Sequence, residues 1–268
     1  MHFVKMEGCG NDYIYIDGAK EKLGNPSWIA RKISDRHFGV GADGMIVIYP
    51  SIRADFRMEM YNADGSRGAM CGNGIRCVGE YVYEYKKTSK KELCIETDSG
   101  IKKLYLDQED GKITNVKVCM GIPKIVKREH LVSIHGKRTP VTIVSMGNPH
   151  AVLFVPSDAG NWKEWGMSIA ERISVHSDFR EGINVELVQV FSEYGMKVRV
   201  WERGTGETLS CGTGACAAVA AALTVGKTSD HVKVEMPGGV LSISGETESG
   251  NMYLEGKSSI ICEGEYYI

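Results

Sequence analysis

The sequence predicts an α+β protein built from two similar halves, and the main reason is a repeat of long period. The segment that starts at Gly10 reads GNDYIYID, and the one that starts at Gly147, 137 residues later, reads GNPHAVLFV. Cys71 opens the segment CGNGIRCVGEYVYEY, and Cys211, 140 residues later, opens CGTGACAAVAAALTV. A third pair, TDSGIKKLYL and MPGGVLSISG, is offset by 139 residues. Three matches in the same order with nearly equal offsets indicate two homologous halves.

Each half is predicted to contain one prominent helix among short strands. After Gly74 and after Gly214, apolar residues recur at the i, i+3, i+4, i+7 spacing of a helix with one buried face. The alanines that follow Gly214 allow close packing on all sides, as in a central helix surrounded by sheet. Alternating segments such as MKVRVWE, ITNVKVCM and VKVEM read as strands, and glycines separate them.

The predicted halves are residues 1–118 and 119–259, because VCMGIPK interrupts the pattern near residues 118–121. The sequence also allows a C-terminal strand over residues 260–268 that returns to the first half. We expect the halves to be related by a pseudo-two-fold axis, with the active site in the cleft between them.

Composition narrows the class of protein and its partners. The 268 residues are 43% hydrophobic and 25% charged, with a net charge of −2, which is typical of a soluble globular protein and gives no reason to expect nucleic acid or a membrane as partner. The N-terminus has no apolar signal-peptide core, and the longest apolar run has ten residues, too few for a membrane span. A cytoplasmic location is therefore expected.

The cysteines do not follow a metal or disulfide pattern. None of the eight forms a C-x-x-C pair, which argues against a zinc site and against a thiol redox motif. A disulfide framework is not expected in a chain of this size without a secretory signal. Most of these cysteines are therefore expected to be ordinary core residues, and no metal is expected.

Two cysteines differ from the others because each precedes a predicted helix in the motif Cys-Gly-x-Gly, at 71–74 and 211–214. A helix N-terminus of this kind binds carboxylates and lowers the pKa of a neighbouring thiol from its free value of about 8.5. If both helix N-termini hold one substrate carboxylate, a thiol lies on each side of the substrate. This arrangement suits inversion at the α-carbon of an amino acid, in which a thiolate removes the α-proton and a thiol on the opposite face delivers one. No cofactor is expected, and the loops lack the Gly-Lys-Ser/Thr of a nucleotide-binding loop.

At these motifs the chain resembles the diaminopimelate epimerase family, over nearly its whole length. The resemblance is carried by GNDYIYID, RHFGVGADG, NADGSRGAMCGNGIRC, GNPHAVLFV, EGINVELVQV, ERGTGETLSCGTGACA and PGGVLSI. It implies a homodimeric enzyme, independent of pyridoxal phosphate, that interconverts LL- and meso-2,6-diaminopimelate on the route to lysine and peptidoglycan. It also implies that each domain is a β-barrel-like sheet around a central helix.

The resemblance assigns roles to individual residues. Cys71 and Cys211 match the acid/base pair, and His150 and Glu202 match residues that bind the α-amino group or tune the thiols. The positions that match the substrate shell are Asn11, Asn62, Gly72, Asn73, Asn148, Asn184, Arg203, Gly212 and Thr213. Among them, Asn62, Asn184 and Arg203 are expected at the distal amino-acid end, and the planar guanidinium of Arg203 suits a carboxylate. Two positions depart from the family: Gly44 stands where many members have glutamine, and Cys262 stands where a tyrosine often lies at the dimer contact.

Two alternative functions remain open at this point. One is racemisation of another amino acid, such as histidine or a proline-like substrate, on the same scaffold. Proline racemases have histidine at the position of Asn73, which argues against that branch. The other is a non-catalytic amino-acid-binding or thiol redox protein, which would not need two thiols at equivalent helix starts.

Overall fold

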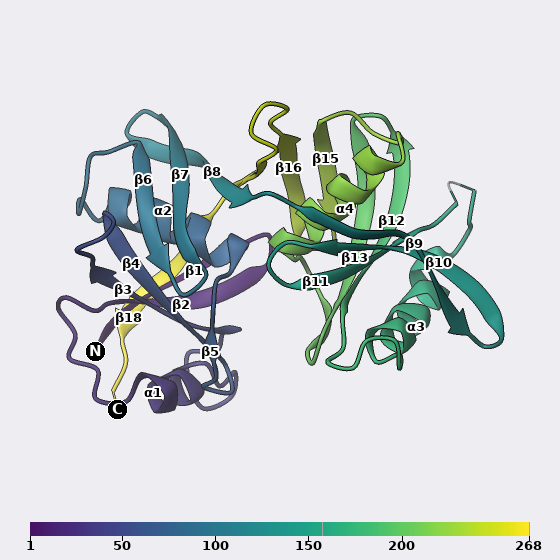
Figure 1. Cartoon of the computed structure of the whole chain (residues 1–268). Coiled ribbons are helices and arrows are strands. Elements are labelled where there is room, and N and C mark those ends of the chain that lie inside the picture. Colours follow the sequence, from purple (N-terminus) through teal and green to yellow (C-terminus); the bar gives the residue numbers. More distant parts are fainter. Residues whose placement is uncertain (157, 268) are drawn as a thin grey trace. The chain divides into compact units, whose positions relative to one another are not determined.

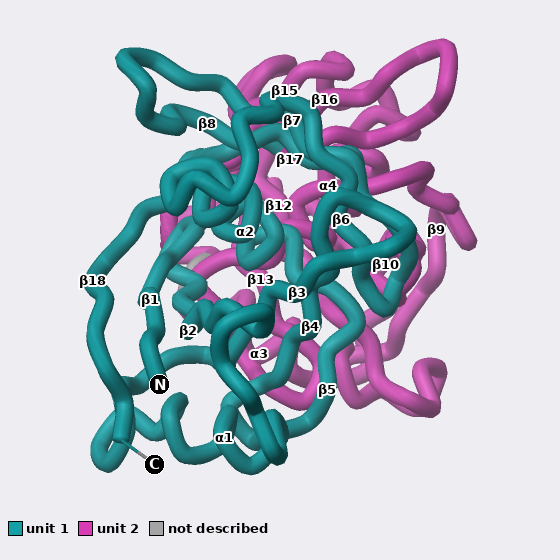
Figure 2. The backbone as a smooth tube through the Cα atoms, turned by 90° about the vertical axis from the view of Figure 1, so that its left-hand side faces the viewer, with its two compact units in different colours: residues 1–119, 255–268 teal, residues 120–254 magenta. Residues whose placement is uncertain are grey.

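The computed structural model describes residues 1–156 and 158–267. The chain forms two compact units, one of residues 1–119 and 255–268 and one of residues 120–254 (Figure 2). They are called here the first and the second unit, and each is described by itself.

The first unit is a sheet with two helices (Figure 1). Its elements are β1 (His2–Gly8), β2 (Asn11–Asp17), α1 (Pro26–Ile33), β3 (Gly44–Pro50), β4 (Phe56–Asn62), β5 (Arg67–Gly68), α2 (Gly72–Glu84), β6 (Glu92–Thr97), β7 (Gly100–Glu109), β8 (Lys112–Gly121) and β18 (Ser259–Glu265).

Strand pairing in the first unit runs β18–β1–β2–β3–β4–β6–β7–β8, with the short β5 also beside β4. The pairs β2–β3 and β4–β6 are parallel and the others are antiparallel. Parallel neighbours need a crossover connection, and α1 and α2 lie in these two connections. The C-terminal strand β18, yellow in Figure 1, lies beside the N-terminal strand β1. Residue 268, the last of the expected strand 260–268, lies outside the described residues.

The second unit repeats this plan. Its elements are β9 (Lys124–Ile134), β10 (Lys137–Ser145), β11 (Pro149–Phe154), α3 (Trp162–Ser174), β12 (Asn184–Ser192), β13 (Gly195–Glu202), β14 (Gly206–Thr208), α4 (Gly212–Thr224), β15 (His231–Met236) and β16 (Gly239–Gly245), and β17 (Met252–Gly256) spans the boundary between the units.

Pairing in the second unit runs β9–β10–β11–β12–β13–β15–β16, with β14 beside β13. Again two pairs are parallel, β11–β12 and β13–β15, and again a helix lies in each of these connections. The order β9–β10–β11–β12–β13–β15–β16 follows the order β18–β1–β2–β3–β4–β6–β7, and the helices lie in equivalent connections. The prediction of an α+β fold with two similar halves is therefore confirmed.

Both helices predicted from the repeat are present, and both are deeply buried. α2 packs on β1, β2 and β7, and α4 packs on β10, β11, β12 and β16. From Gly214 to Ala222 every residue of α4 is buried, and most of them are alanines. Small side chains on all sides let the strands approach this helix closely, so the alanine-rich composition follows from its central position.

A second helix in each unit, α1 and α3, was not predicted. α1 has local signals: the side chain of Asn25 accepts a hydrogen bond from the Trp28 N–H, and Pro26 occupies the first turn. It buries Ile29, Ala30 and Ile33 against a hydrophobic cluster that includes residues of β2 and β3. The glycine and cysteine motifs that indicate the repeat lie outside α1 and α3, so they do not predict these two helices.

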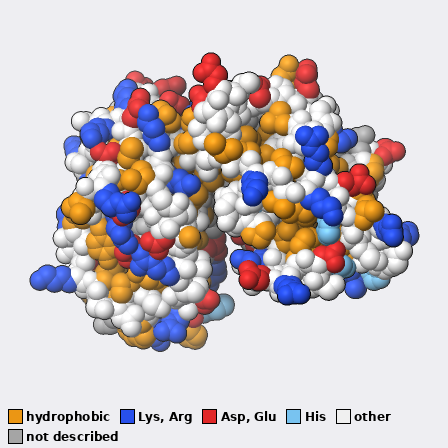
Figure 3. Space-filling view, viewed as in Figure 1, with side chains coloured by type: hydrophobic (Ala, Val, Ile, Leu, Met, Phe, Trp, Pro, Cys, Tyr) orange, Lys and Arg blue, Asp and Glu red, His pale blue; other side chains and the backbone are white. Residues whose placement is uncertain are grey.

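The surface carries charges of both signs. Figure 3 shows lysine and arginine side chains interspersed with aspartate and glutamate on the face in view. Among the described residues, no helix has the length and apolar character needed to cross a membrane.

Candidate active site

Cys71 is the residue at which α2 begins. Its backbone is extended, and its sulfur accepts a hydrogen bond from the Gly74 N–H at 3.3 Å, as the side chain of an N-cap residue does. The thiol also donates to Oδ1 of Asn11 at 3.1 Å. Gly72 and Asn73 form the first turn directly after it, so their backbone lies at the helix N-terminus. The structure thus brings together four of the predicted site residues of the first unit.

Asn11 is held in place by an ionic network at the start of β2. Its side-chain amide donates to Asp43 Oδ2 at 2.7 Å, and Arg36 bridges Asp43 and Asp12 with contacts of 2.9 Å to each carboxylate. Arg36 and Asp43 belong to RHFGVGADG, so this motif orients Asn11 toward Cys71. Burial alone would raise the pKa of Asp12, but the hydrogen bonds and positive charges of Arg36 and Lys5 outweigh it and lower that pKa.

The start of α2 rests on a buried arginine that the sequence analysis did not identify. Arg76 is fully buried, and its Nη1 donates to the Gly72 carbonyl at 3.2 Å and to Asn73 Oδ1 at 2.8 Å. The side chain of Asn73 therefore points into the first unit, toward Arg76. What Asn73 presents at the helix start is its backbone.

Gly44 and Asn62 lie opposite one another in the pair β3–β4. The side chain of Asn62 donates to Ser66 Oγ at 2.9 Å across the NADG turn. Gly44 is confined by its neighbours, because a Cβ there would lie 2.2 Å from the Tyr61 carbonyl oxygen and 2.7 Å from a ring carbon of Tyr13. The glycine at this departure from the family is therefore required by close packing of the backbone.

Replacing Gly44 with alanine is expected to lower the free energy of unfolding by about 1–3 kcal/mol, because the added methyl group forces the backbone of β4 to move. Urea unfolding followed by circular dichroism measures this loss. Gly24→Ala is the control, since no atom lies within 4 Å of a Cβ at Gly24. Equal stability of the two variants would contradict the packing argument.

In the second unit, Cys211 occupies the same position at the start of α4. Its backbone is extended, and its sulfur lies 3.4 Å from the Thr213 hydroxyl oxygen. Gly212 and Thr213 form the first turn, as Gly72 and Asn73 do in α2.

The prediction that a helix start lowers the thiol pKa is wrong for Cys211. Burial raises the pKa of this thiol well above its usual range, and the neighbouring carboxylates of Glu202 and Glu186 raise it further. Hydrogen bonds from Thr213 and from the Gly214 N–H oppose the shift without cancelling it. Desolvation of the thiolate outweighs the helix dipole here, so Cys211 is a thiol at neutral pH.

His150 lies on β11 and is fully buried together with a glutamate on the neighbouring strand β12. His150 Nδ1 lies 2.6 Å from Glu186 Oε1, and both side chains are 0% exposed. Nε2 of His150 lies 3.1 Å from Asn148 Oδ1, and the Asn148 amide donates to Thr213 Oγ1 at 3.4 Å. Side-chain contacts thus connect four predicted residues in the order His150, Asn148, Thr213 and Cys211.

Asn184, Glu202 and Arg203 form a second group in this unit. Asn184 pairs with His150 in the parallel register of β11 and β12, and its Oδ1 accepts a hydrogen bond from the Arg203 N–H at 2.9 Å. Glu202 accepts a hydrogen bond from the Thr208 hydroxyl at 2.7 Å and acts on the Cys211 thiol through its charge. The Arg203 guanidinium donates to the Glu181 carbonyl at 3.2 Å. Asn184, at the start of β12, therefore positions the Arg203 backbone.

The prediction that the six remaining cysteines are core thiols is confirmed only in part, because Cys9, Cys94 and Cys119 are half-buried. Cys77 and Cys216 are fully buried, and burial raises the pKa of each to about 12. Cys262, on β18, is exposed. Neither Cys77 nor Cys216 is therefore ionised at neutral pH.

Sequence reasoning missed Glu186, Arg76 and Asp43 as parts of these sites. Glu186 and Asp43 lie inside motifs that carry the resemblance, EGINVELVQV and RHFGVGADG, but the partners that define their roles come from other strands. Arg76 follows Cys71 in CGNGIRC, where a charged residue on a predicted helix is read as exposed. No local signal distinguishes it from a surface arginine.

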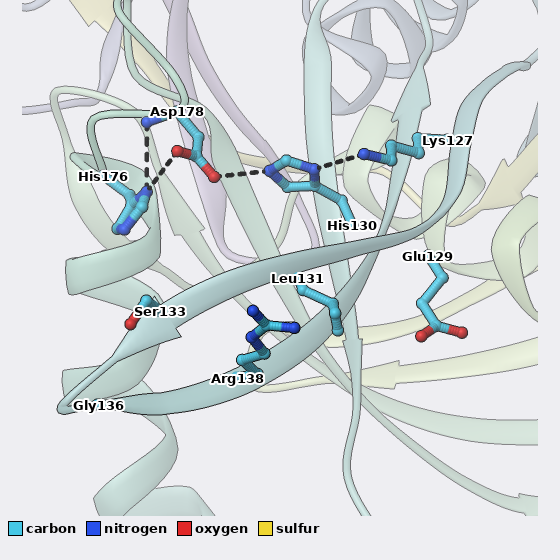
Figure 4. A pocket seen from close by; sticks show the side chains of 9 residues that line it. All are labelled: Lys127, Glu129, His130, Leu131, Ser133, Gly136, Arg138, His176 and Asp178. Carbon is cyan, nitrogen blue, oxygen red and sulfur yellow. Dashed lines mark hydrogen bonds and ion pairs between the residues drawn. The ribbon is translucent and has the colours of Figure 1, made fainter.

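A pocket of the second unit contains none of the predicted residues. The cavity, about 630 Å³, is formed by the β9–β10 hairpin and the turn after α3 (Figure 4). Asp178 bridges His130, at 2.8 Å, and His176, at 3.5 Å, and Lys127 reaches the other ring nitrogen of His130. These polar groups satisfy one another. Among the described residues of the whole chain, no three His, Cys, Asp or Glu side chains are arranged to hold a metal ion.

Solved structures share this architecture. A probable proline racemase from Agrobacterium radiobacter K84 matches with a TM-score of 0.76 at 16% identity, over 100% of this chain and 93% of that one. A hydroxyproline epimerase from Agrobacterium vitis matches with a TM-score of 0.74 at 16% identity, over 98% and 91%. At these identities the likeness concerns the fold.

Sequence relatives are more specific. The diaminopimelate epimerase of Acetivibrio thermocellus is 45% identical, over 99% of this chain and 98% of its own length. Those of Methanococcus maripaludis and Desulfovibrio desulfuricans are 43% and 42% identical, over 99% and 100% of this chain and 99% of their own length. The profile of the family described as diaminopimelate epimerase matches residues 3–126 and 142–261.

The two-unit fold, with a Cys-Gly-x-Gly helix start in each unit, and these relatives define an isomerase of the amino-acid racemase and epimerase class. Within that class, the chain belongs to the diaminopimelate epimerase family.

Proposed function

We propose that this enzyme interconverts LL- and meso-2,6-diaminopimelate without a cofactor, with Cys71 and Cys211 as its acid/base pair. The observation that carries the proposal is that a cysteine occupies the N-cap of the central helix in both units. Inversion at the α-carbon needs one proton-transfer group for each face of that carbon. The chain offers two thiols in equivalent places.

The proposed step balances without another reactant. The thiolate of one cysteine takes the α-proton, the electron pair of the broken C–H bond spreads into the substrate carboxylate, and the thiol of the other cysteine protonates the opposite face. Backbone N–H groups at the helix starts of Gly72–Asn73 and Gly212–Thr213 would stabilise the negative charge on that carboxylate. Burial favours the protonated form of Cys211, which is the form that delivers a proton to the substrate.

The remaining predicted residues would bind the rest of the substrate or tune the thiols. Asn11 contacts the Cys71 thiol directly, and Asn148 is linked to the Cys211 thiol through Thr213. His150 is fully buried, so it would tune the Cys211 thiol through Asn148 and Thr213. Glu202 would act near the α-amino group, and Asn62, Asn184 and Arg203 at the distal amino-acid end. The specificity for a substrate with two amino-acid ends would come from this second set.

We also propose that the enzyme is a cytoplasmic homodimer that serves lysine and peptidoglycan precursor synthesis. Support comes from the family and from the cysteines, all eight of which are free thiols, as suits a reducing compartment. Analytical ultracentrifugation of the purified protein tests the dimer. A sedimentation mass of one chain at all concentrations would contradict it.

The reaction is tested by incubating the reduced enzyme with LL-diaminopimelate in D2O, without pyridoxal phosphate, and following the α-proton signal and the meso isomer. We expect loss of the α-proton signal together with formation of meso product. Histidine, proline and lysine are run in parallel and are expected to remain unchanged. Exchange with one of these amino acids and none with diaminopimelate would contradict the proposed substrate, and no exchange with any would contradict the reaction.

A further inference from the structure

The buried pair of Glu186 and His150 holds a hydrogen between its two side chains. The Nδ1–Oε1 distance is 2.6 Å, and both side chains are 0% exposed. Oε2 of Glu186 has no hydrogen-bond partner among the described residues, so a bare carboxylate would be poorly solvated there. Burial raises the pKa of Glu186, which favours retention of a proton in the pair. One hydrogen therefore lies between Nδ1 and Oε1.

The hydrogen bonds beyond the pair run in one direction, toward the Cys211 sulfur. Nε2 of His150 faces the acceptor Oδ1 of Asn148, so Nε2 carries a hydrogen. The Asn148 amide donates to Thr213 Oγ1, and the Thr213 hydroxyl is then left to donate to Cys211 Sγ at 3.4 Å. If Nε2 were bare, the Asn148 amide would turn over, and Thr213 would donate to Asn148 instead.

The first unit shows that packing does not require a carboxylate at this place. In the equivalent register Tyr13 corresponds to His150, and Ile46 corresponds to Glu186. A Cβ on Gly74 would lie 2.7 Å from Ile46 Cδ1, and a Cβ on Gly214 would lie 2.7 Å from Glu186 Oε1. The same space under the two helix starts is filled by isoleucine in one unit and by glutamate in the other. The glutamate is present in the unit that has a histidine on the neighbouring strand, and the isoleucine in the unit that has a tyrosine there.

We propose that Glu186 is a positioning residue for the reaction: by sharing a hydrogen with Nδ1 it maintains the Nε2–H form of His150, and this form directs the Thr213 hydroxyl toward the Cys211 sulfur. The kinetic part of this inference rests on the proposed function. Its structural part, the direction of the hydrogen bonds at Cys211, does not.

The direction matters because Cys211 has to ionise in one sense of the reaction. Because the pair of Glu186 and His150 retains a proton, it carries no net charge. Within the second unit, the carboxyl groups that face the Cys211 sulfur are Glu202 on β13 and Glu186 on β12, and a negative charge on either one disfavours the thiolate. The Thr213 hydroxyl and the Gly214 N–H favour it. Loss of the Thr213 donor would leave the thiolate with less stabilisation in a buried place.

The test replaces Glu186 with isoleucine, the residue of the first unit, and measures alkylation of Cys211 by iodoacetamide as a function of pH, with peptide mass spectrometry to isolate this cysteine. In E186I the midpoint is expected to move upward by about 0.5–1 pH unit, the effect of losing one hydrogen bond to the thiolate. If Glu186 acted only through its charge, its removal would move the midpoint downward. If it only packed, the midpoint would stay. A downward or absent shift overturns the proposal.

A double-mutant cycle locates the effect in the Thr213 hydroxyl. T213V is expected to raise the midpoint as E186I does, and E186I/T213V to raise it no further than either single variant. Additive shifts would overturn the proposed connection. E186M replaces E186I if the isoleucine variant lacks a cooperative thermal transition, since methionine adapts to irregular space. T142V, which removes another buried hydroxyl of this unit, is the control and is expected to leave the midpoint in place.

Kinetics gives a second readout. E186I is expected to lower kcat about tenfold with KM nearly unchanged, because Glu186 acts through His150 and lies away from the substrate. A raised KM with an unchanged kcat would contradict a positioning role. If the wild-type enzyme does not act on diaminopimelate, the proposed function fails, while the alkylation profiles still decide the direction of the hydrogen bonds.

Discussion

Serine in place of either Cys71 or Cys211 is expected to lower the epimerisation of LL-diaminopimelate about a thousandfold while the fold is retained. A serine hydroxyl is far less acidic than a thiol, so it neither accepts nor delivers a proton at the α-carbon at neutral pH. It is nevertheless a good N-cap, so α2 and α4 should keep their first turns. Formation of meso product, followed by chiral chromatography, measures the loss, and circular dichroism measures the fold.

The two variants also separate proton exchange from inversion. A variant with one remaining thiol can still exchange the α-proton of one stereoisomer with D2O and return a deuteron to the same face. Exchange with retention of configuration is therefore expected from one stereoisomer in each variant. C94S, which alters a half-buried thiol on β6 with no assigned role, is the control and should behave as wild type. Turnover within tenfold of wild type in C71S or C211S would contradict the acid/base pair.

Removal of the Arg76 side chain is expected to lower the free energy of unfolding by about 3 kcal/mol and to impair turnover. R76A leaves a cavity where the largest fully buried side chain lay, and it removes the donors to Gly72 and Asn73. Because these two residues form the start of α2, the backbone beside Cys71 should lose its support. Urea unfolding and steady-state kinetics measure the two effects.

Two further variants separate packing from hydrogen bonding. R76M fills much of the same volume without donors, so it should recover part of the stability and little of the turnover. R53A removes an arginine that is largely exposed and is expected to change stability by less than about 0.5 kcal/mol. A stability of R76A equal to that of R53A would show that the buried guanidinium does not support the helix start.

The fold was predictable because its strongest signals are local and occur twice. The motif Cys-Gly-x-Gly followed by apolar residues at helical spacing predicted α2 and α4, and alternating segments predicted strands such as β13 and β15. The parallel pairs β2–β3 and β11–β12 were not predictable in the same way, since strand neighbours depend on contacts between distant segments. The helices α1 and α3 lie outside the glycine and cysteine motifs from which the repeat was read.

For the candidate site, the sequence by itself determined which residues are proposed for the chemistry: two cysteines at helix starts, a histidine after Gly-Asn-Pro, and an arginine beside a glutamate. Only the tertiary structure decided how each group behaves. It set Glu186 against His150, placed Arg76 beneath the start of α2, and raised the pKa of Cys211 where the helix start alone would lower it. The reason is physical. Periodicity and turn residues act within a few positions of the chain, whereas burial and charge depend on which distant strands come to surround a side chain.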